Sequence, residues 1–497
     1  MKSHPCTWLS VACLAAALTM TIQLPAQDNA DHNNNQPRYR LVEIATFGGP
    51  DNGPTEGPPL LRILTNSGIA IGLADTSISD PYYPNCIVGE CYVVNGFQWQ
   101  NGMQKDLGPL SGVNSAIPVG INESGVAVGL SQNGSIDPLT GFPENDAVIW
   151  EHGTINNLGT FGGNGSIAWA INDWGQVVGG ALNSIPDNYA SGQPFFAFPV
   201  AQQYRAFLWQ NGNKRDLGTL GGNDAVAALV NDLGQIAGDS YTNSTPNPTT
   251  GVPTLDPFIW QNGRMLDLGT LGGTFGYPNW LNLWGQVVGQ SNLAGDQTYH
   301  PFLWSGGTLR DLGTFGGPSG AANWVNDAGE VVGQADLSGG QCQGFACQHH
   351  AFLWKNGRLN DLGTVGSDPC SRAFSINLVG QVVGESGPVC GGEFTASAAT
   401  LWQNGAIYDL NTLIPPGSGL TLNVGWDIND GGEITGSAVL PNGNVRAFVL
   451  IPCGRNDPDG CQNQLLDRAS GTDNLTLAPK KINPSREGLA RSYHGGS

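Results

Sequence analysis

The stretch Asp216-Leu217-Gly218-Thr219-Leu220-Gly221-Gly222, continued by Val230 to Gly238 and by Pro257 to Gly263, decides the fold of this chain. Its parts recur along the sequence in the same order. The Asn of the Asn-x-x-Gly part stands at Asn66, Asn122, Asn172, Asn231, Asn282, Asn326, Asn377 and Asn429. The Trp of the Phe-Leu-Trp part stands at Trp99, Trp150, Trp209, Trp260, Trp304, Trp354 and Trp402, with Leu450 in the eighth place. The chain therefore contains eight repeats of about 50 residues.

Each repeat predicts four short strands joined by tight turns. Asn-Asp-x-Gly, as at Asn172, favours a turn because Asn suits its first position and Gly its fourth. The β-branched run Gln176 to Gly179 follows it as a strand. Asn-Gly after the Trp, as at Asn211, is a hairpin signal because both residues adopt positive φ. We call the strands A (before Asn-x-x-Gly), B (after it), C (at Phe-Leu-Trp) and D (at Asp-Leu-Gly-Thr).

Four short antiparallel strands per repeat are typical of a propeller blade, so we predict an all-β protein with eight four-stranded blades. The last repeat has its C strand (Ala447 to Leu450) but no D strand. At the other end, Tyr39 to Thr46 is a D strand with no C strand before it. Docking one beside the other completes the eighth blade and removes two exposed edges. A β-solenoid is the alternative, and the blade number is open by one if the first repeat is a degenerate cap.

The N-terminal sequence has the layout of a secretory signal peptide. An apolar stretch from Leu9 to Leu24 is followed by Pro25-Ala26, so we expect cleavage after Ala26. The predicted organisation is a signal peptide at 1–26, a flexible segment at 27–38, the repeat domain at 39–451 and a largely flexible tail at 452–497. No later segment has about 20 uninterrupted apolar residues, so we expect a secreted or periplasmic protein without a membrane span.

Composition narrows the classes of partner. The chain has 20 Lys and Arg against 40 Asp and Glu, a formal net charge of −20. Phosphate binding needs clusters of Lys and Arg, so nucleic acid is not an expected partner. With 73 glycines but 40% apolar residues, the chain is neither disordered nor collagen-like. We expect a monomer.

Eight cysteines follow the signal peptide, in four local pairs. Export makes disulfides the default interpretation, and zinc is the competitor, although no pair has Cys-x-x-Cys spacing. We therefore predict disulfides, no metal and no cofactor. The predicted pairs are Cys86 with Cys91, Cys342 with Cys347, Cys370 with Cys390, and Cys453 with Cys461.

The repeats resemble those of the bacterial extracellular HAF-repeat family, named for a His-Ala-Phe triplet. The triplet is complete at His350-Ala351-Phe352 and is followed by Leu353-Trp354. Other repeats depart from it, as in Arg205-Ala206-Phe207 and His300-Pro301-Phe302, so the His is not required in every repeat. The resemblance covers about residues 40–451. It implies an exported, propeller-like protein and brings no catalytic residues.

Ligand-binding candidates lie in the B–C loops. In a four-stranded blade the A–B and C–D turns lie on one face, and the B–C and D–A connections lie on the other. Here the B–C loops vary in length, and variable loops on a rigid scaffold are the usual place for binding. Their aromatic side chains could stack on sugar rings. The candidates are Tyr82, Tyr83, Tyr189, Phe195, Phe196, Tyr241 and Tyr299. Trp174 and Trp284 differ from the other Trp residues because each stands third in an A–B turn, where side chains usually reach solvent.

The sequence therefore favours a binding or interaction module, for carbohydrate or another cell-envelope component, over an enzyme. Catalytic residues are unknown, because no G-x-S-x-G, H-E-x-x-H or P-loop motif is present. One alternative is a carbohydrate-active hydrolase or lyase with acidic loop residues at the mouth of the channel. Another is a protein-interaction scaffold with no small ligand.

Overall fold

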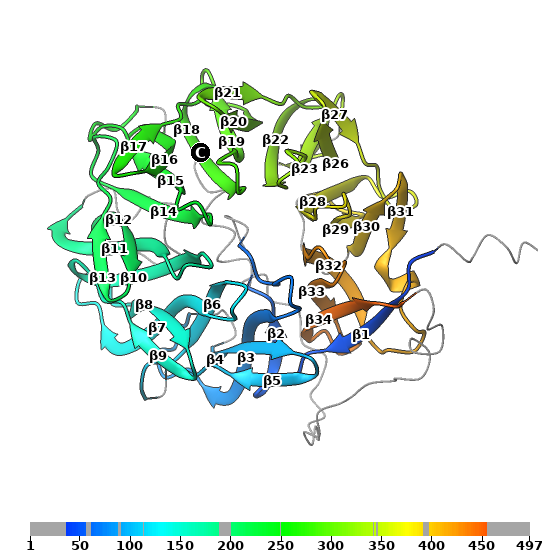
Figure 1. The fold of residues 1–497 in the computed structure, drawn as a ribbon, viewed down its shortest axis with the longest axis horizontal. Helices are drawn as coiled ribbons and strands as arrows, with labels where there is room; N and C mark the ends of the chain where they lie inside the picture. The colour runs from blue at the N-terminus through cyan, green and yellow to red at the C-terminus, as the bar shows by residue number, and fades with distance from the viewer. Residues whose placement is uncertain are drawn as a thin grey trace, which may run out of the picture. The chain divides into compact units, whose positions relative to one another are not determined.

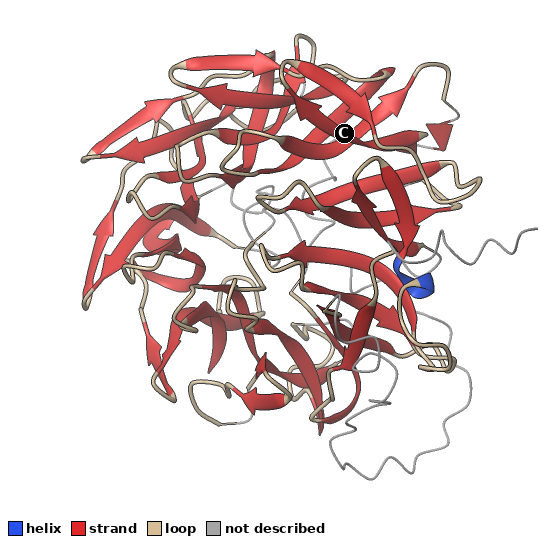
Figure 2. Ribbon diagram, turned by 45° about the vertical axis from the view of Figure 1, so that its right-hand side comes forward, coloured by secondary structure: helices blue, strands red, loops and turns tan. Residues whose placement is uncertain are grey.

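The computed structural model describes residues 36–55, 61–87, 91–112, 114–187, 200–248, 250–340, 342–343, 346–390 and 397–454, with the backbone alone at 342, 343 and 346. The chain divides into two units, Met1–Gln36 and Pro37–Ser497, and every described strand belongs to the second. Among the described residues of this unit, strands account for almost all regular structure, beside one short 3-10 helix, η4 (Leu410–Thr412) (Figure 2).

Apart from one short hairpin, the described strands form four-stranded antiparallel sheets that follow one another around a common centre (Figure 1). The first four repeats, in the order A to D, are β2 (Gly48–Gly53), β3 (Ala70–Ser79), β4 (Tyr92–Gln100), β5 (Met103–Asp106); β6 (Ala116–Ile121), β7 (Ala127–Ile136), β8 (Pro143–Glu151), β9 (Thr154–Asn157); β10 (Gly162–Ile171), β11 (Val177–Pro186), β12 (Gln202–Gln210), β13 (Asn213–Asp216); and β14 (Ala225–Val230), β15 (Ile236–Tyr241), β16 (Leu255–Gln261), β17 (Arg264–Asp267).

The next three repeats continue the pattern. They are β18 (Gly272–Leu281), β19 (Val287–Leu293), β20 (Tyr299–Ser305), β21 (Thr308–Asp311); β22 (Gly316–Val325), β23 (Val331–Leu337), β26 (His349–Lys355), β27 (Arg358–Asp361); and β28 (Cys370–Ile376), β29 (Val382–Gly387), β30 (Ala398–Gln403), β31 (Ala406–Asp409). The hairpin, β24 (Cys342–Gln343) with β25 (Ala346–Cys347), lies in the sixth B–C loop. A single parallel pairing, Leu255 with Phe275, joins the fourth sheet to the fifth.

The last sheet combines the two ends of the described chain. It has the order β1-β34-β33-β32, with β32 (Thr421–Ile428), β33 (Ile434–Val439), β34 (Val445–Pro452) and β1 (Tyr39–Glu43). Strand β1 pairs antiparallel with β34, from Tyr39 opposite Pro452 to Glu43 opposite Phe448. The backbone N–H of Ala447 also donates to Asn52 Oδ1 of the first sheet, at 2.6 Å.

The C–D turns have the backbone that their sequence predicts. The two central residues adopt positive φ in seven repeats, as at Asn211 (φ 51°) and Gly212 (φ 81°). This conformation matches the right-handed twist of the flanking strands, so it keeps the hairpin in register. The strand C tryptophans pack between sheets. Trp99, Trp150, Trp260 and Trp402 are buried, as predicted.

The first residue of the His-Ala-Phe position clamps the outer strand of its sheet. His350 Nδ1 lies 2.9 Å from Asp361 Oδ2, and His300 Nδ1 lies 2.9 Å from Asp311 Oδ2. Arg205 makes the same contact with Asp216, and Asn95 makes it with Asp106. Any donor of suitable length can therefore replace the His, which explains why the triplet varies. The fourth repeat places Asp256 opposite Asp267, and burial and the facing carboxylate raise the pKa of Asp256.

The Asn of each Asn-x-x-Gly turn links its own turn to the turn of the next sheet. Asn231 Oδ1 accepts the N–H groups of Leu233 and Gln235, which fixes the turn. Asn231 Nδ2 donates across the sheet boundary to the backbone oxygen of Asn282, at 2.9 Å. Seven such bonds of 2.9–3.1 Å run from sheet to sheet, donated by Asn122, Asn172, Asn231, Asn282, Asn326, Asn377 and Asn429. The prediction of Asn66 for the first repeat is wrong, because Thr65 occupies this position: its Oγ1 accepts the N–H of Ile69, and the bond from Asn429 ends on Thr65 O.

Acidic side chains add a second set of bonds between the same turns. The N–H of Asp173 donates to Asp232 Oδ1, and that of Leu283 donates to Asp327 Oδ1, each at 2.9 Å. The N–H of Asp430 donates to Asn66 Oδ1, again connecting the last repeat to the first. The turn sequence thus encodes contacts between sheets as well as the turn itself.

We predict that Asn231→Asp destabilises the protein by about 2–3 kcal/mol at pH 7, because the variant keeps the turn acceptor but faces Asn282 O with a second acceptor. Asn231→Ala loses both functions and should cost more. Urea unfolding at pH 7 and pH 4 measures both. Protonation turns the introduced carboxylate into a donor, so the deficit of Asn231→Asp should shrink at pH 4. Equal deficits at the two pH values would contradict the role of the inter-sheet bond.

Candidate functional site

Near the B–C loops, the polarity of the side chains at the centre of the repeat domain differs between repeats. Around the first four repeats the centre is apolar: Ile117, Ile167 and Val226 from A strands pack with Leu73 and Leu130 from B strands into one buried cluster. Loop residues Ile87 and Val200 join this cluster. At the B-strand position that Leu130 occupies in the second repeat, the fifth to seventh repeats carry the polar or charged residues Gln290, Gln334 and Glu385.

Arg372 lies at the middle of this polar part. It stands on β28, where other A strands carry Ile117, Ile167 or Val226, and it pairs in register with Glu385 of β29. Its Nε donates to Glu385 Oε1, and its guanidinium lies 5.8 Å from the centre of the Phe374 ring. The Arg372 side chain is 21% exposed and that of Glu385 is 4% exposed. A charge-assisted pair this deep holds the guanidinium in one orientation.

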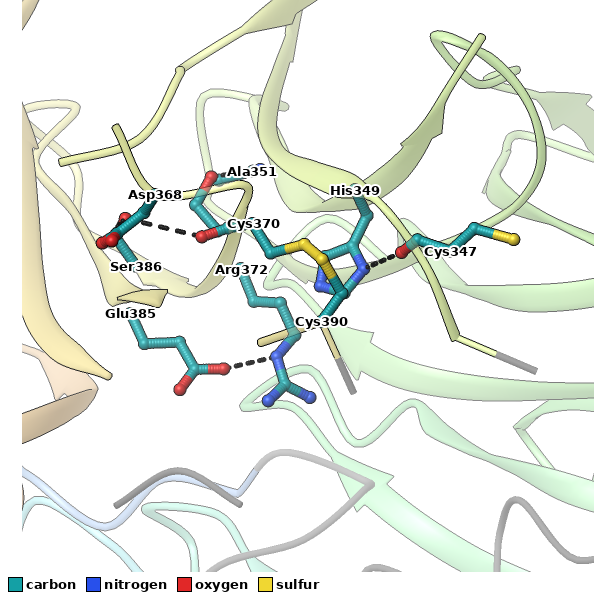
Figure 3. Close-up of a disulfide and its surroundings, with 10 residues drawn as sticks. Cys347, His349, Ala351, Asp368, Cys370, Arg372, Glu385, Ser386 and Cys390 are labelled. Carbon is teal, nitrogen blue, oxygen red and sulfur yellow. Dashed lines mark hydrogen bonds and ion pairs between the residues drawn. A yellow bond between two sulfur atoms is a disulfide. The ribbon is translucent and has the colours of Figure 1, made fainter. Parts of the chain in front are cut away.

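His349 of β26 adds a neutral imidazole to the cluster (Figure 3). Its Nδ1 lies 2.9 Å from the backbone oxygen of Cys347. A carbonyl oxygen only accepts, so Nδ1 carries the proton and Nε2 keeps its lone pair. Burial, reinforced by the positive charge of Arg372, lowers the pKa of His349 to about 4. The ring therefore offers an acceptor at neutral pH.

Asp336 of β23 and Tyr299 of β20 complete the cluster. Asp336 Oδ2 accepts the N–H of Ser319 at 3.0 Å, and burial raises the pKa of Asp336 to about 6. Burial raises the pKa of Tyr299 to about 12, with Asp336 adding to the shift and Arg372 opposing it. Tyr299, Asp336, His349, Arg372 and Glu385 come from three successive repeats. Together they present a fixed cation, a hydroxyl and several acceptors.

A disulfide braces this cluster. Cys370 of β28, two residues before Arg372, is bonded to Cys390, in the B–C segment after β29 (Figure 3). The bond ties the seventh B–C loop to the start of the strand that carries the arginine. Cross-links of this kind limit how far a binding loop can move.

Two of the predicted disulfides are present, Cys86–Cys91 and Cys370–Cys390. Cys347 and Cys453 are also disulfide-bonded. The side chain of Cys342 and the whole of Cys461, their predicted partners, lie outside the described residues.

The structure does not bring the four described aromatic candidates together. Tyr83 is 76% exposed, while Tyr82 is partly buried and donates from its hydroxyl to Asn114 Oδ1 at 3.0 Å. Tyr241 is fully buried, with Val226 and Leu255 in the apolar cluster, so its ring belongs to the core and not to a binding surface. Of the candidates that the structure describes, only Tyr299 joins the polar cluster. Tyr189, Phe195 and Phe196 lie outside the described residues.

Sequence reasoning missed Arg372, Glu385, Asp336 and His349 as a group. A signal was present, because Arg372 and Glu385 are charged residues at A and B positions that are apolar in the second repeat, at Ile117 and Leu130. Charged residues at positions that are apolar in other repeats indicate that these residues have a role other than packing the core.

A cavity of about 220 Å³ opens among the A–B turns. Its lining includes the turn asparagines, Trp169, Trp280 and Trp324, and also Leu61, Arg62 and Leu64 from an insertion between β2 and β3. This insertion is fixed at the centre because Asp427 Oδ2 accepts the N–H groups of Ile63 and Leu64, at 3.3 and 3.2 Å. Arg62 pairs with Glu123 at 3.3 Å.

Carboxylate pairs also occur in the fourth repeat. Burial, with a further contribution from Asp187, raises the pKa of Asp224 to about 8. Asp224 is fully buried, and its Oδ1 accepts the N–H of Tyr204 at 2.6 Å. Ser115 makes the equivalent contact in the second repeat, where its hydroxyl accepts the N–H of Val94 on the preceding C strand, so Asp224 performs a structural role.

Comparison with known proteins gives structural likenesses only. No protein-family model matches the chain, and no curated protein matches it. The β-propeller domain of the Trilobed protease from Pyrococcus furiosus is 8% identical, with a TM-score of 0.40, over 75% of this chain and 96% of that one. A puromycin-hydrolyzing peptidase from Mycobacterium tuberculosis is 12% identical, with a TM-score of 0.40, over 81% of this chain and 62% of that one. TolB from Acinetobacter baumannii is 11% identical, with a TM-score of 0.29, over 84% and 96%.

The strand pairings themselves define the class: an all-β protein of β-propeller type, built from four-stranded antiparallel sheets. Among the described residues, no helix has the length and apolarity needed to cross a membrane. Within the same residues, no group of three or more His, Cys, Asp and Glu side chains is arranged to hold a metal ion.

We predict that His349 makes the stability of the protein fall in mild acid. Its pKa in the folded state, about 4, lies below the ordinary value of 6.5, so the unfolded chain binds more protons between these pH values. The free energy of unfolding should therefore drop by about 2–3 kcal/mol from this group as the pH falls from 7 to 4. Urea unfolding of His349→Gln at several pH values should lack this part of the decline. His152→Gln, at an exposed turn, serves as the control and should follow the unmodified protein. If the free energy of unfolding depends on pH in the same way in His349→Gln and in the unmodified protein, the lowered pKa of His349 is refuted.

Proposed function

We propose that this chain is an exported, closed eight-bladed β-propeller whose first strand completes the eighth blade. The pairing of β1 with β34 and the contacts from Asn429 to Thr65 and from Ala447 to Asn52 support the closure. Disulfides at Cys86–Cys91 and Cys370–Cys390 support an oxidising location, secreted or periplasmic. Residues 1–26 would be the signal peptide, and the repeats would be of the HAF type.

We further propose that the protein is a binding module, and that the cluster around Arg372 holds a polyhydroxylated ligand such as a cell-envelope carbohydrate. The observation that carries the proposal is the Arg372–Glu385 pair, a partly exposed guanidinium fixed by a buried carboxylate. The pair is neutral as a unit, so it favours hydroxyl groups over a free anion. Tyr299 and His349 add a hydroxyl and a ring nitrogen of complementary hydrogen-bonding character.

Asp336 favours a second candidate, a hydrolase or lyase acting on the same ligand class. A carboxyl group with a pKa of about 6 keeps a proton longer than an ordinary Asp, which is what a general acid requires. The two candidates share the site and differ in whether the bound polymer is cleaved.

Retention on insoluble and immobilised polysaccharides tests both candidates, with the supernatant analysed by mass for released fragments. We expect retention without fragments. Arg372→Lys keeps the charge but loses the planar guanidinium and its several N–H donors, so it should weaken binding about tenfold or more. Arg310→Lys is the matched control: its guanidinium lies 5.8 Å from the Trp354 ring, on outer strand β21, and binding should not change.

If the unmodified protein releases fragments and Asp336→Asn does not, the protein is the hydrolase or lyase and not a simple binding module. If the unmodified protein and Arg372→Lys are retained equally, the ligand binds elsewhere than at this cluster. No retention on any polymer would remove carbohydrate as the ligand. Circular dichroism of each variant checks that the strands are intact, since Glu385 is buried beside Arg372.

A further inference from the structure

The A–B face carries large apolar side chains that are exposed. They stand at the second or third position of the Asn-x-x-Gly turns. Trp174 is 72% exposed, Leu233 58%, Trp284 65%, Leu378 51% and Val379 72%. These residues come from the third, fourth, fifth and seventh repeats, and we call them the apolar arc. The prediction that Trp174 and Trp284 reach solvent is confirmed.

The two Trp rings of the apolar arc are held in place although they are exposed. Trp174 Nε1 donates to the backbone oxygen of Asp232 at 2.9 Å, and Trp284 Nε1 donates to that of Asp327 at 3.0 Å. Each ring is therefore anchored on the next sheet and presents its faces outward. Aromatic side chains fixed before binding lose little entropy when a partner arrives.

The turns of the remaining repeats provide an internal comparison. Their third positions hold Ser67, Ser124, Ala328 and Gly431. The turn backbone is the same there, as the hydrogen bonds Gly125 N to Asn122 O and Gly432 N to Asn429 O show. The turn itself therefore does not require an apolar residue at this position, and the apolar arc needs another explanation.

Carboxylates stand beside the apolar arc at the second positions of the turns. They are Glu123, Asp173, Asp232, Asp327 and Asp430. Arg62, at the same cavity, pairs with Glu123. A surface with Trp faces and carboxylates suits Lys and Arg side chains accompanied by apolar ones. A second copy that docked through the same face would bring the same acidic groups, so that arrangement does not fit.

The chain itself contains a segment with the required chemistry. Residues 478–497 include Lys480, Lys481, Arg486 and Arg491 with a single acidic residue, Glu487, and they also include Ile482, Leu489 and Tyr493. These residues lie beyond those that the structure describes.

The described chain ends close to the A–B face. Strand β34 finishes at Pro452, and a Cβ placed on Gly432 of the last A–B turn would lie 3.4 Å from Pro452 Cγ. From Gly454 to Lys480 the chain can span up to about 85 Å when extended. Attachment to the same molecule also gives the segment a high effective concentration, on the order of millimolar, so weak contacts suffice.

We infer that the apolar arc and its carboxylates form a docking surface for residues 478–497 of the same chain. The basic side chains meet the turn carboxylates, and the apolar ones cover Trp174 and Trp284. The surface lies on the face opposite the B–C loops, so this inference does not depend on the proposed carbohydrate site.

Zero-length carbodiimide cross-linking of the full chain, followed by peptide mass spectrometry, tests the inference. We expect Lys480 and Lys481 to link to the five turn carboxylates at least about fivefold more often than to Asp216, Asp267 and Asp361 of the outer strands. In Trp174→Ala/Trp284→Ala these links should fall about tenfold. In Ser67→Ala/Ser124→Ala, the matched control at the polar turns, they should persist.

Leu233→Asp provides a variant that leaves both Trp anchors intact, and its added negative charge on an apolar position should also reduce the links. A mixture of ¹⁵N-labelled and unlabelled protein identifies links between molecules. Three results would each overturn the inference. The preferential links could persist in all the apolar variants, or Lys480 and Lys481 could link equally often to the outer strands. The links could also form only between differently labelled molecules.

Discussion

The structure depends on the side-chain amide of the turn Asn, whose oxygen and nitrogen make hydrogen bonds at the same time. In the A–B turns of the second to eighth repeats the Asn oxygen closes the turn, while the Asn nitrogen bonds to the backbone of the turn in the next sheet, as at Asn231. In a repeat protein whose units touch only their neighbours, stability depends on such interfaces as well as on the units themselves. A single residue type therefore sets the conformation of the turn and the spacing of neighbouring sheets. The bond from Asn429 to Thr65 extends the series to the first repeat.

The outer strands are fixed by a separate and more tolerant interaction. An Asp on the D strand accepts from whichever donor stands at the first position of the His-Ala-Phe triplet, whether His, Arg or Asn. Because the inner turns and the outer clamps account for the constant parts of the repeat, neither constrains the B–C loops. Sequence variation can accumulate in those loops and in the A and B positions beside them without loss of the fold. The Arg372 cluster occupies that permissive region.

Much of the fold is predictable from local sequence, since Asn-Gly and Asn-x-x-Gly specify turns through backbone preferences that act within four residues. Asn211 and Gly212 adopt the expected positive φ, and the strand β1 pairs with the final C strand. The polar cluster was not predictable in the same way. Its members come from three repeats, and their proximity depends on how the sheets lie against one another. Tyr241 illustrates the converse error, because a residue at the end of a B strand was assigned to the loop that follows, whereas its ring packs in the core.

The insertion between β2 and β3 has a consequence for the repeat domain as a whole. Residues 61–64 lie at the centre of the sheets, where Asp427 holds the N–H groups of Ile63 and Leu64 and Arg62 pairs with Glu123. Leu61 packs against the apolar cluster beneath the B–C loops, while it also lines the cavity among the A–B turns. One segment of the chain thus links the cavity among the A–B turns to the apolar cluster.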